Sequence, residues 1–145
     1  MIALDTNLLV YAHRRDSPRH EHAARRIRDV AEGSASWAIP WPCLHEFLAI
    51  VTDERVYRPP SPMSKALDQI KAWLESPSLI LVSETDGSLA TLMELVATAR
   101  ITGPRIHDAR IAALCLHANV RELLRADRDF SRFGALKTRN PLMRA

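Results

Sequence analysis

The sequence predicts an α/β fold around a central, mainly parallel sheet. Short apolar segments typical of buried strands alternate along the chain with longer segments typical of helices. This is the order expected of parallel strands joined by crossover helices. The 145 residues are enough for one hydrophobic core and too few for two. We therefore expect a single domain over residues 1–145.

Strand and helix signals follow one another over the first 53 residues. Ser17-Pro18 combines an N-cap residue with a proline suited to the first helical position, and Gly33 predicts the end of the arginine-rich helix between them. The expected elements are a strand at Ile2–Leu4, a helical turn through Ala12, a helix between Pro18 and Gly33, a strand at Ser36–Ile39, and a helix from about Pro40 to Asp53.

The same alternation continues to residue 126. Residues 55–63 contain three prolines and no hydrophobic period, so they predict a loop. Thr102-Gly103-Pro104 interrupts the helical pattern, and Asn119 closes the helix that follows. The expected elements are helices from Ser61-Pro62 to about Ser76, from Asp86 to about Ile101 and from Ile106 to Ala118, with strands at Leu79–Val82 and Val120–Ala126.

The charge balance favours arginine. The formal charge is +3 and the isoelectric point about 9.2, yet only Lys65, Lys71 and Lys137 are lysines. Guanidinium groups bind phosphate through paired donors, so this bias suits a polyanionic partner, although a GC-rich genome would produce the same bias. Cys43 and Cys115 lie in apolar helical patterns and predict buried, reduced thiols. With no apolar run near the roughly 20 residues of a membrane helix, we expect a soluble cytoplasmic protein.

Four carboxylates stand beside apolar segments, where an isolated charge is costly to desolvate: Asp5, Glu46, Asp108 and Asp127. No lysine cluster matches them, and oxygen-rich sites of this kind are typical of hard divalent cations. The set therefore predicts a Mg²⁺-dependent phosphodiester chemistry, with Mn²⁺ as a substitute. Bound metal would lower the pKa of a coordinated water for in-line attack on the phosphodiester.

Strand ends and helix faces indicate where the acids meet. Asp5 and Asp127 each follow a predicted strand, and parallel sheets bind ligands beyond the carboxyl ends of their strands. Asp108 shares a helical stripe with Ile111 and Cys115 on the apolar side of its helix. Each acid has a structural alternative: Asp5 and Asp127 as helix caps, Asp108 as a partner of the helix dipole, and Glu46 as a solvated surface residue.

With these residues in place, the chain resembles the PIN-domain ribonucleases, and specifically the VapC-type toxins of bacterial toxin–antitoxin pairs. The matching stretches, in the family's order, are Leu4-Asp5-Thr6-Asn7, Glu46 in His-Glu-Phe, Ile106-His107-Asp108-Ala109-Arg110, and Leu124-Arg125-Ala126-Asp127-Arg128-Asp129-Phe130. The resemblance implies a three-layer α/β/α fold. It implies metal binding at Asp5 and Asp108 most firmly, with Glu46 and Asp127 completing the pocket.

The resemblance also implies supporting roles and partners. Thr6 and Asn7 would support the pocket through side-chain hydrogen bonds. The family usually has threonine or serine two residues before the fourth acid, where this chain has Arg125, so Asp129 is kept beside Asp127 as a candidate. Homodimerisation and inhibition by a small VapB-type antitoxin are implied as well.

Arginines near the acids in sequence are expected to neutralise the RNA backbone and to make cleavage sensitive to salt. They are Arg14, Arg15, Arg105, Arg110 and Arg128. Sequence-specific RNA recognition usually targets single-stranded loops, so we expect a structured RNA cut in a loop.

Three other functions fit some of these residues. A phosphatase with an aspartyl nucleophile would need a second acid two residues after Asp5, where Asn7 stands. A receiver-type Mg²⁺-binding regulatory module would need a lysine near the acids, and no lysine is close in sequence to Asp5, Asp108 or Asp127. A PIN-like module that binds RNA without cutting it would keep the fold, and Arg125 leaves this alternative open.

Overall fold

A five-stranded parallel sheet forms the centre of the computed structural model, which describes residues 1–126 and 136–142. The strand order is β3-β2-β1-β4-β5, and all four neighbouring pairs are parallel. The strands are β1 (Ile2–Leu4), β2 (Trp37–Pro40), β3 (Leu79–Val82), β4 (Glu122–Leu124) and β5 (Lys137–Arg139). The predicted parallel sheet is confirmed.

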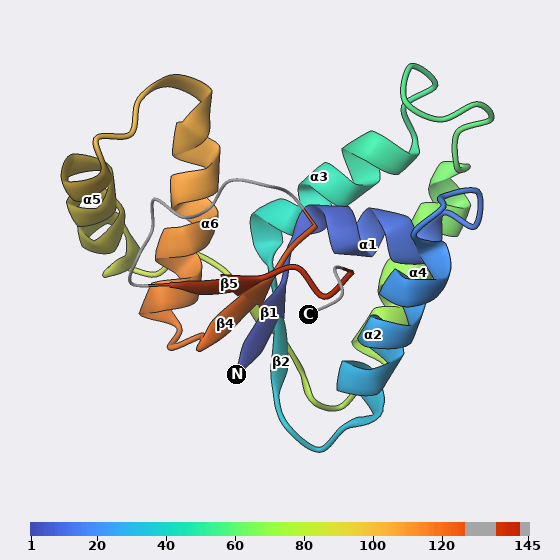
Figure 1. Ribbon diagram of the computed structural model, residues 1–145, viewed down its shortest axis with the longest axis horizontal. Helices are drawn as coiled ribbons and strands as arrows, with labels where there is room; N and C mark the ends of the chain where they lie inside the picture. Colours follow the sequence, from blue (N-terminus) through green and yellow to red (C-terminus); the bar gives the residue numbers. More distant parts are fainter. Residues whose placement is uncertain (127–135, 143–145) are drawn as a thin grey trace.

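Helices cover both faces of this sheet. Figure 1 shows α5 and α6 on one side and α1, α2 and α4 on the other, which is the predicted three-layer arrangement. The helices are α1 (Thr6–His13), α2 (His20–Glu32), α3 (Trp41–Val51), α4 (Met63–Leu74), α5 (Ser88–Ala99) and α6 (Ile106–His117), with the short 3₁₀ helix η1 (Gly103–Arg105) before α6.

The core lies around the central strand. Ala3 and Leu4 of β1 are fully buried, because β2 and β4 pair with both edges of the strand and helices cover its faces. Leu8 and Leu9 of α1 and Phe47 of α3 complete this part of the core. Apolar burial at about 25 cal/mol per Å² makes such side chains the main source of stability.

Several boundaries differ from the sequence prediction, among them the start of the second helix. The second helix begins at His20 and not at Pro18, because Ser17 forms a turn: its side chain accepts a hydrogen bond from the Arg19 N–H and its carbonyl accepts one from the His20 N–H. The expected N-cap at Ser17 was therefore wrong. At the other end of the fold, Asn119 has a φ of 59° and closes α6 as predicted.

The edge strand β5 was not predicted at all. Its three residues, Lys-Thr-Arg, carry no apolar pattern, and tertiary contacts hold them in the sheet. Arg139 pairs with the buried carboxylate of Glu122 on β4, with 2.8 Å between Nε and Oε1. In the register of β4 and β5, Glu122 lies opposite Lys137, which places a second positively charged residue across from it.

The carboxyl edge of the sheet carries the sequence motifs. The N–H of Asp5, just past β1, donates to the carbonyl of Leu124 at the end of β4 over 2.9 Å. The chain segments after these two strands are thus held side by side. Asp127, Arg128 and Asp129 lie outside the described residues. Within the described ranges, no helix is long and apolar enough to cross a membrane.

Candidate active site

Asp5 occupies the first position after the central strand. It is the N-cap of α1, and its Oδ1 accepts a hydrogen bond from the Thr6 N–H at 2.8 Å. The residue is only 5% exposed. The capping role considered from sequence is therefore real, and it fixes the carboxylate at the sheet edge, where parallel α/β proteins bind their ligands.

Thr6 connects Asp5 to the second predicted acid. The Thr6 hydroxyl donates to Oε2 of Glu46 on α3 over 2.9 Å, and Thr6 is only 4% exposed. Glu46 itself is exposed, as its helical position predicted, but the hydrogen bond points its carboxylate toward the end of β1. The structure thus brings Asp5 and Thr6 together with Glu46, which lies 40 positions after Thr6 in the sequence.

Two further side chains contact Asp5. Arg125, directly after β4, places its guanidinium 3.4 Å from Oδ2 of Asp5, and both side chains are buried. Cys43 of α3 places its thiol 3.4 Å from Oδ1. Burial, and next the negative charge of Asp5, raise the pKa of the Cys43 thiol, so it stays protonated and can donate to the carboxylate.

Sequence reasoning noted Arg125 and Cys43 without assigning them to the site. A signal for Arg125 was nevertheless available. β1 and β4 are aligned with Leu4 opposite Leu124, so the next residues of the two strands, Asp5 and Arg125, must be neighbours. The signal depends on knowing that these two strands are adjacent, which local sequence patterns do not reveal.

Asp108 lies in the first turn of α6 and is half-buried. Because α6 leads back to β4, which is parallel to β1, the helix runs opposite to the strands and its first turn lies toward the carboxyl edge (Figure 1). Two residues further along α6, Arg110 pairs with Glu84, which follows β3. This ion pair lowers the pKa of Glu84 and raises that of Arg110, with a smaller contribution to Arg110 from the charge of Glu46.

The arginines predicted to bind RNA differ in their surroundings. Arg110 faces Glu84 and lies within electrostatic range of Glu46, which places it near the acids. Arg14 is at the opposite end of α1 from Asp5, where it pairs with Asp16, donates to Ser61 and stacks over Tyr57. Arg15 is exposed, Arg105 ends η1, and Arg128 lies outside the described residues.

The supporting residues can be placed in the same way. Thr6 makes the predicted side-chain hydrogen bond, and Asn7 lies half-buried in the first turn of α1. In the described part of the chain, no three His, Cys, Asp or Glu side chains form a cluster able to hold a metal ion. Of the four predicted acids, Asp5 and Glu46 are linked through Thr6, and Asp127 lies outside the described residues.

Comparison with protein families gives a match to the PIN domain over residues 2–136. The chain belongs to the PIN domain family. The match includes both halves of the sheet and every strand up to β4, together with all four predicted acids. The resemblance inferred from the motifs is thereby confirmed.

Relatives of this PIN domain share its length as well as its fold. It is 31% identical over 142 residues to the ribonuclease VapC43 of Mycobacterium tuberculosis, covering 98% of this chain and 96% of the relative. The structure of VapBC2 from Rickettsia felis, bound to a DNA fragment of its promoter, superposes with a TM-score of 0.71 at 20% identity over 97% of this chain and 98% of that one. VapC20 of M. tuberculosis, described as a toxin that cleaves the sarcin-ricin loop, superposes with a TM-score of 0.64 at 16% identity over 93% and 95% of the two chains.

Proposed function

We propose that this PIN domain is the toxin of a VapBC-type pair and cleaves RNA as a divalent-metal-dependent endoribonuclease. The observation that carries the proposal is the hydrogen-bonded series Asp5, Thr6 and Glu46 at the carboxyl edge of the sheet. It holds two carboxylates from different elements in fixed positions. The relatives that cover the whole chain are named ribonucleases, which agrees with this chemistry.

The donor set suits Mg²⁺ or Mn²⁺. Mg²⁺ is usually bound by one or two carboxylates and keeps several of its waters, so Asp5 and Glu46 suffice as a nucleus, with Asp108 and Asp127 as further ligands. The 3.4 Å between Arg125 and Oδ2 of Asp5 exceeds the 2.7–2.9 Å of a tight charged hydrogen bond, so we propose that a lone pair of that oxygen is available to a cation. When bound, the cation supplies an activated water and charge neutralisation for phosphodiester hydrolysis.

The chain's own residues prepare this site. The Thr6 N–H and the Cys43 thiol both point at Oδ1 of Asp5 and leave it one preferred orientation. The Thr6 hydroxyl orients Glu46, which would otherwise be a mobile exposed side chain. Such preorganisation lowers the entropic cost of assembling ligands, water and substrate in a reactive geometry. Asn7 and Asp129 are proposed to support the same pocket.

RNA is proposed to reach the acids along arginine side chains. Arg110 is the best placed of the predicted set, and Arg15, Arg105 and Arg128 are proposed to contact phosphates farther out, with Arg14 held in its own local contacts. Phosphate contacts of this kind are weakened by salt and carry no sequence information. A loop in a structured RNA is the proposed target class.

A VapB-type antitoxin and a second copy of the chain are the proposed protein partners. Between α5 and α6, a cavity of about 140 Å³ has Leu89 and Leu92 on its wall and the Glu84–Arg110 pair on its rim. An apolar side chain of an antitoxin segment would fit there while the segment passes the acids. Leu67 and Leu74 on α4 expose further apolar surface suited to a homodimer. With free thiols at Cys43 and Cys115, the cytoplasm is the proposed location.

The test is cleavage of a mixed RNA pool by the purified full chain with Mg²⁺, with Mn²⁺ and with EDTA. Asp5→Asn and Asp108→Asn are compared with the matched control Asp68→Asn, which changes an exposed acid on α4. We expect metal-dependent cleavage that both site variants lose by about 100-fold or more and that the control keeps.

Cleavage that survives both site substitutions would contradict the assignment of the site. Metal binding without cleavage of any RNA would instead support the non-cleaving Mg²⁺-binding module. A calorimetric Mn²⁺ titration of the same proteins separates these two outcomes, because it reports on the acids without requiring the right RNA.

A further inference from the structure

A second cavity, of about 480 Å³, lies at the edge of the sheet opposite to the acids. Its lining includes Ile2 at the start of β1, Trp37 at the start of β2, and Arg121 immediately before β4. Asp5, in contrast, follows the carboxyl end of β1. The cavity is therefore separate from the candidate active site, and its volume falls within the range typical of small-molecule sites.

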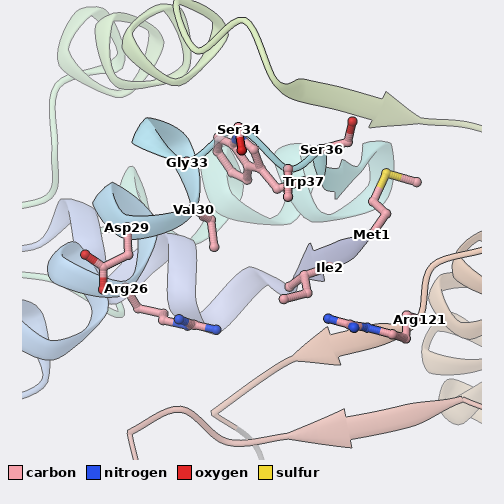
Figure 2. A pocket seen from close by; sticks show the side chains of 11 residues that line it. Met1, Ile2, Arg26, Asp29, Val30, Gly33, Ser34, Ser36, Trp37 and Arg121 are labelled. Carbon is pink, nitrogen blue, oxygen red and sulfur yellow. The ribbon is translucent and has the colours of Figure 1, made fainter.

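Two arginines dominate the charge of this cavity. Figure 2 shows the guanidinium groups of Arg26, on α2, and Arg121 pointing toward one another across it, while the carboxylate of Asp29 points away from both. Because both guanidinium groups face the cavity and the carboxylate of Asp29 points away from them, the cavity favours an anionic ligand.

The walls of the cavity are fixed by backbone and side-chain bonds. The Arg121 N–H donates to the carbonyl of Met1 over 2.8 Å, which holds Arg121 beside the first strand. On the other side, the Trp37 N–H donates to the carbonyl of Ser78, and the Trp37 indole donates to the hydroxyl of Ser76. The walls of the cavity are thus held in place by strand residues as well as by the loop 33–36.

The remaining lining defines the ligand class. The lining also includes Ser34 and Ser36, and Ile2 and Val30 add apolar surface to it. Paired guanidinium groups bind phosphate through parallel N–H donors, and the apolar surface can take an uncharged part of the same ligand. We propose that this cavity binds a phosphate-bearing ligand of mononucleotide size, with Arg26 and Arg121 holding the phosphate.

Calorimetric titration of the full chain with AMP, and separately with inorganic phosphate, tests the proposal. The variants are Arg26→Gln and Arg121→Gln, and Arg28→Gln is the matched control because Arg28 is exposed on the same helix and does not line the cavity. Circular dichroism checks the fold of each protein. We expect AMP binding to weaken by about tenfold in each cavity variant and to stay within about twofold in the control.

Absence of saturable AMP binding by the wild-type chain, or equal binding by both cavity variants, would overturn the proposal. A second arm identifies the source of the phosphate. The same proteins are titrated with a labelled single-stranded RNA in EDTA, so that no cleavage occurs. If RNA affinity falls in parallel and AMP competes, the phosphate is that of RNA; if only AMP binding falls, the ligand is a free nucleotide. Neither arm requires ribonuclease activity, so the result is independent of the proposed function.

Discussion

The guanidinium of Arg125 lies 3.4 Å from the carboxylate of Asp5, and the two side chains are 7% and 8% exposed. A fixed positive charge therefore adjoins the Asp5 oxygen that we propose as a metal ligand. Buried ion pairs of this kind contribute little net stability compared with an apolar pair, but they strongly influence what else can bind. We interpret Arg125 as a residue that moderates metal affinity at Asp5.

Replacing Arg125 with methionine should tighten Mn²⁺ binding by about tenfold, because charges a few ångströms apart interact by about 1 kcal/mol even at the dielectric constant of water and the cation carries two. The measurement is an electron paramagnetic resonance titration of free Mn²⁺. Arg28→Met, an exposed change on α2, should leave the affinity unaltered. Unchanged or weaker binding in Arg125→Met would show that the guanidinium does not oppose the ion.

Thr6→Val removes the hydroxyl that orients Glu46 and keeps the size of the side chain. We expect RNA cleavage to fall by about tenfold, since Glu46 loses its fixed position, and unfolding free energy to fall by about 1 kcal/mol. Single-turnover kinetics and urea unfolding measure the two effects. Thr98→Val on the exposed side of α5 serves as the control, and equal activity in both variants would argue against the orienting role.

Both thiols should resist modification in the folded protein. Burial, followed by the charge of Asp5, raises the pKa of Cys115 to about 12, and the pKa of Cys43 is raised as well by the same two causes in the same order. Thiolate is the reactive form, so a disulfide reagent at about pH 8 should react slowly with the native chain. In denaturant, the same reagent should react rapidly with two thiols per chain. Rapid labelling of either thiol in the native chain would contradict its burial in the core.

The free energy of unfolding should fall on mild acidification because His13 becomes protonated. Its ring nitrogens contact Ser61 and Gln69, and desolvation lowers its pKa below the ordinary 6.5. The unfolded chain then binds the proton more tightly than the folded one, so stability present above about pH 6.5 decreases as the pH drops below that value. Thermal unfolding at about pH 7.5 and 5.5 tests this.

The matched variants for that measurement are His13→Gln and His22→Gln, the second being an exposed histidine on α2. The difference in melting temperature between the two pH values should shrink in His13→Gln and persist in His22→Gln. If the two variants behave alike, His13 is not the group responsible.

Local patterns were sufficient for most of the fold. The strands Ile2–Leu4 and Leu79–Val82 were predicted at their observed bounds, because apolar runs bounded by polar or proline residues are a strong signal. β5 escaped prediction because its stability comes from pairing with β4 and from the Glu122–Arg139 contact, and a three-residue polar segment carries no such information.

Part of the candidate site could also be predicted from the sequence. Asp5 and Glu46 were identified from their unfavourable sequence surroundings, and the structure brings them together through Thr6. The contact between Asp5 and Arg125 could not be predicted in this way, since it joins residues 120 positions apart and depends on which strands are neighbours. Arg14 illustrates the converse: it is near Asp5 in sequence, yet its contacts are with Asp16, Ser61 and Tyr57.

The order of the strands also determines when the protein can become active during its synthesis. β1, which is made first, lies between β2 and β4, so one of its edges has no neighbour until residues 122–124 have left the ribosome. Pairing over such a long sequence separation is slow and comes late in folding. A nascent chain that has not reached β4 lacks the Leu124 carbonyl that anchors Asp5, and it therefore has no assembled acidic pocket. The acidic pocket therefore assembles only after β1 and β4 have paired.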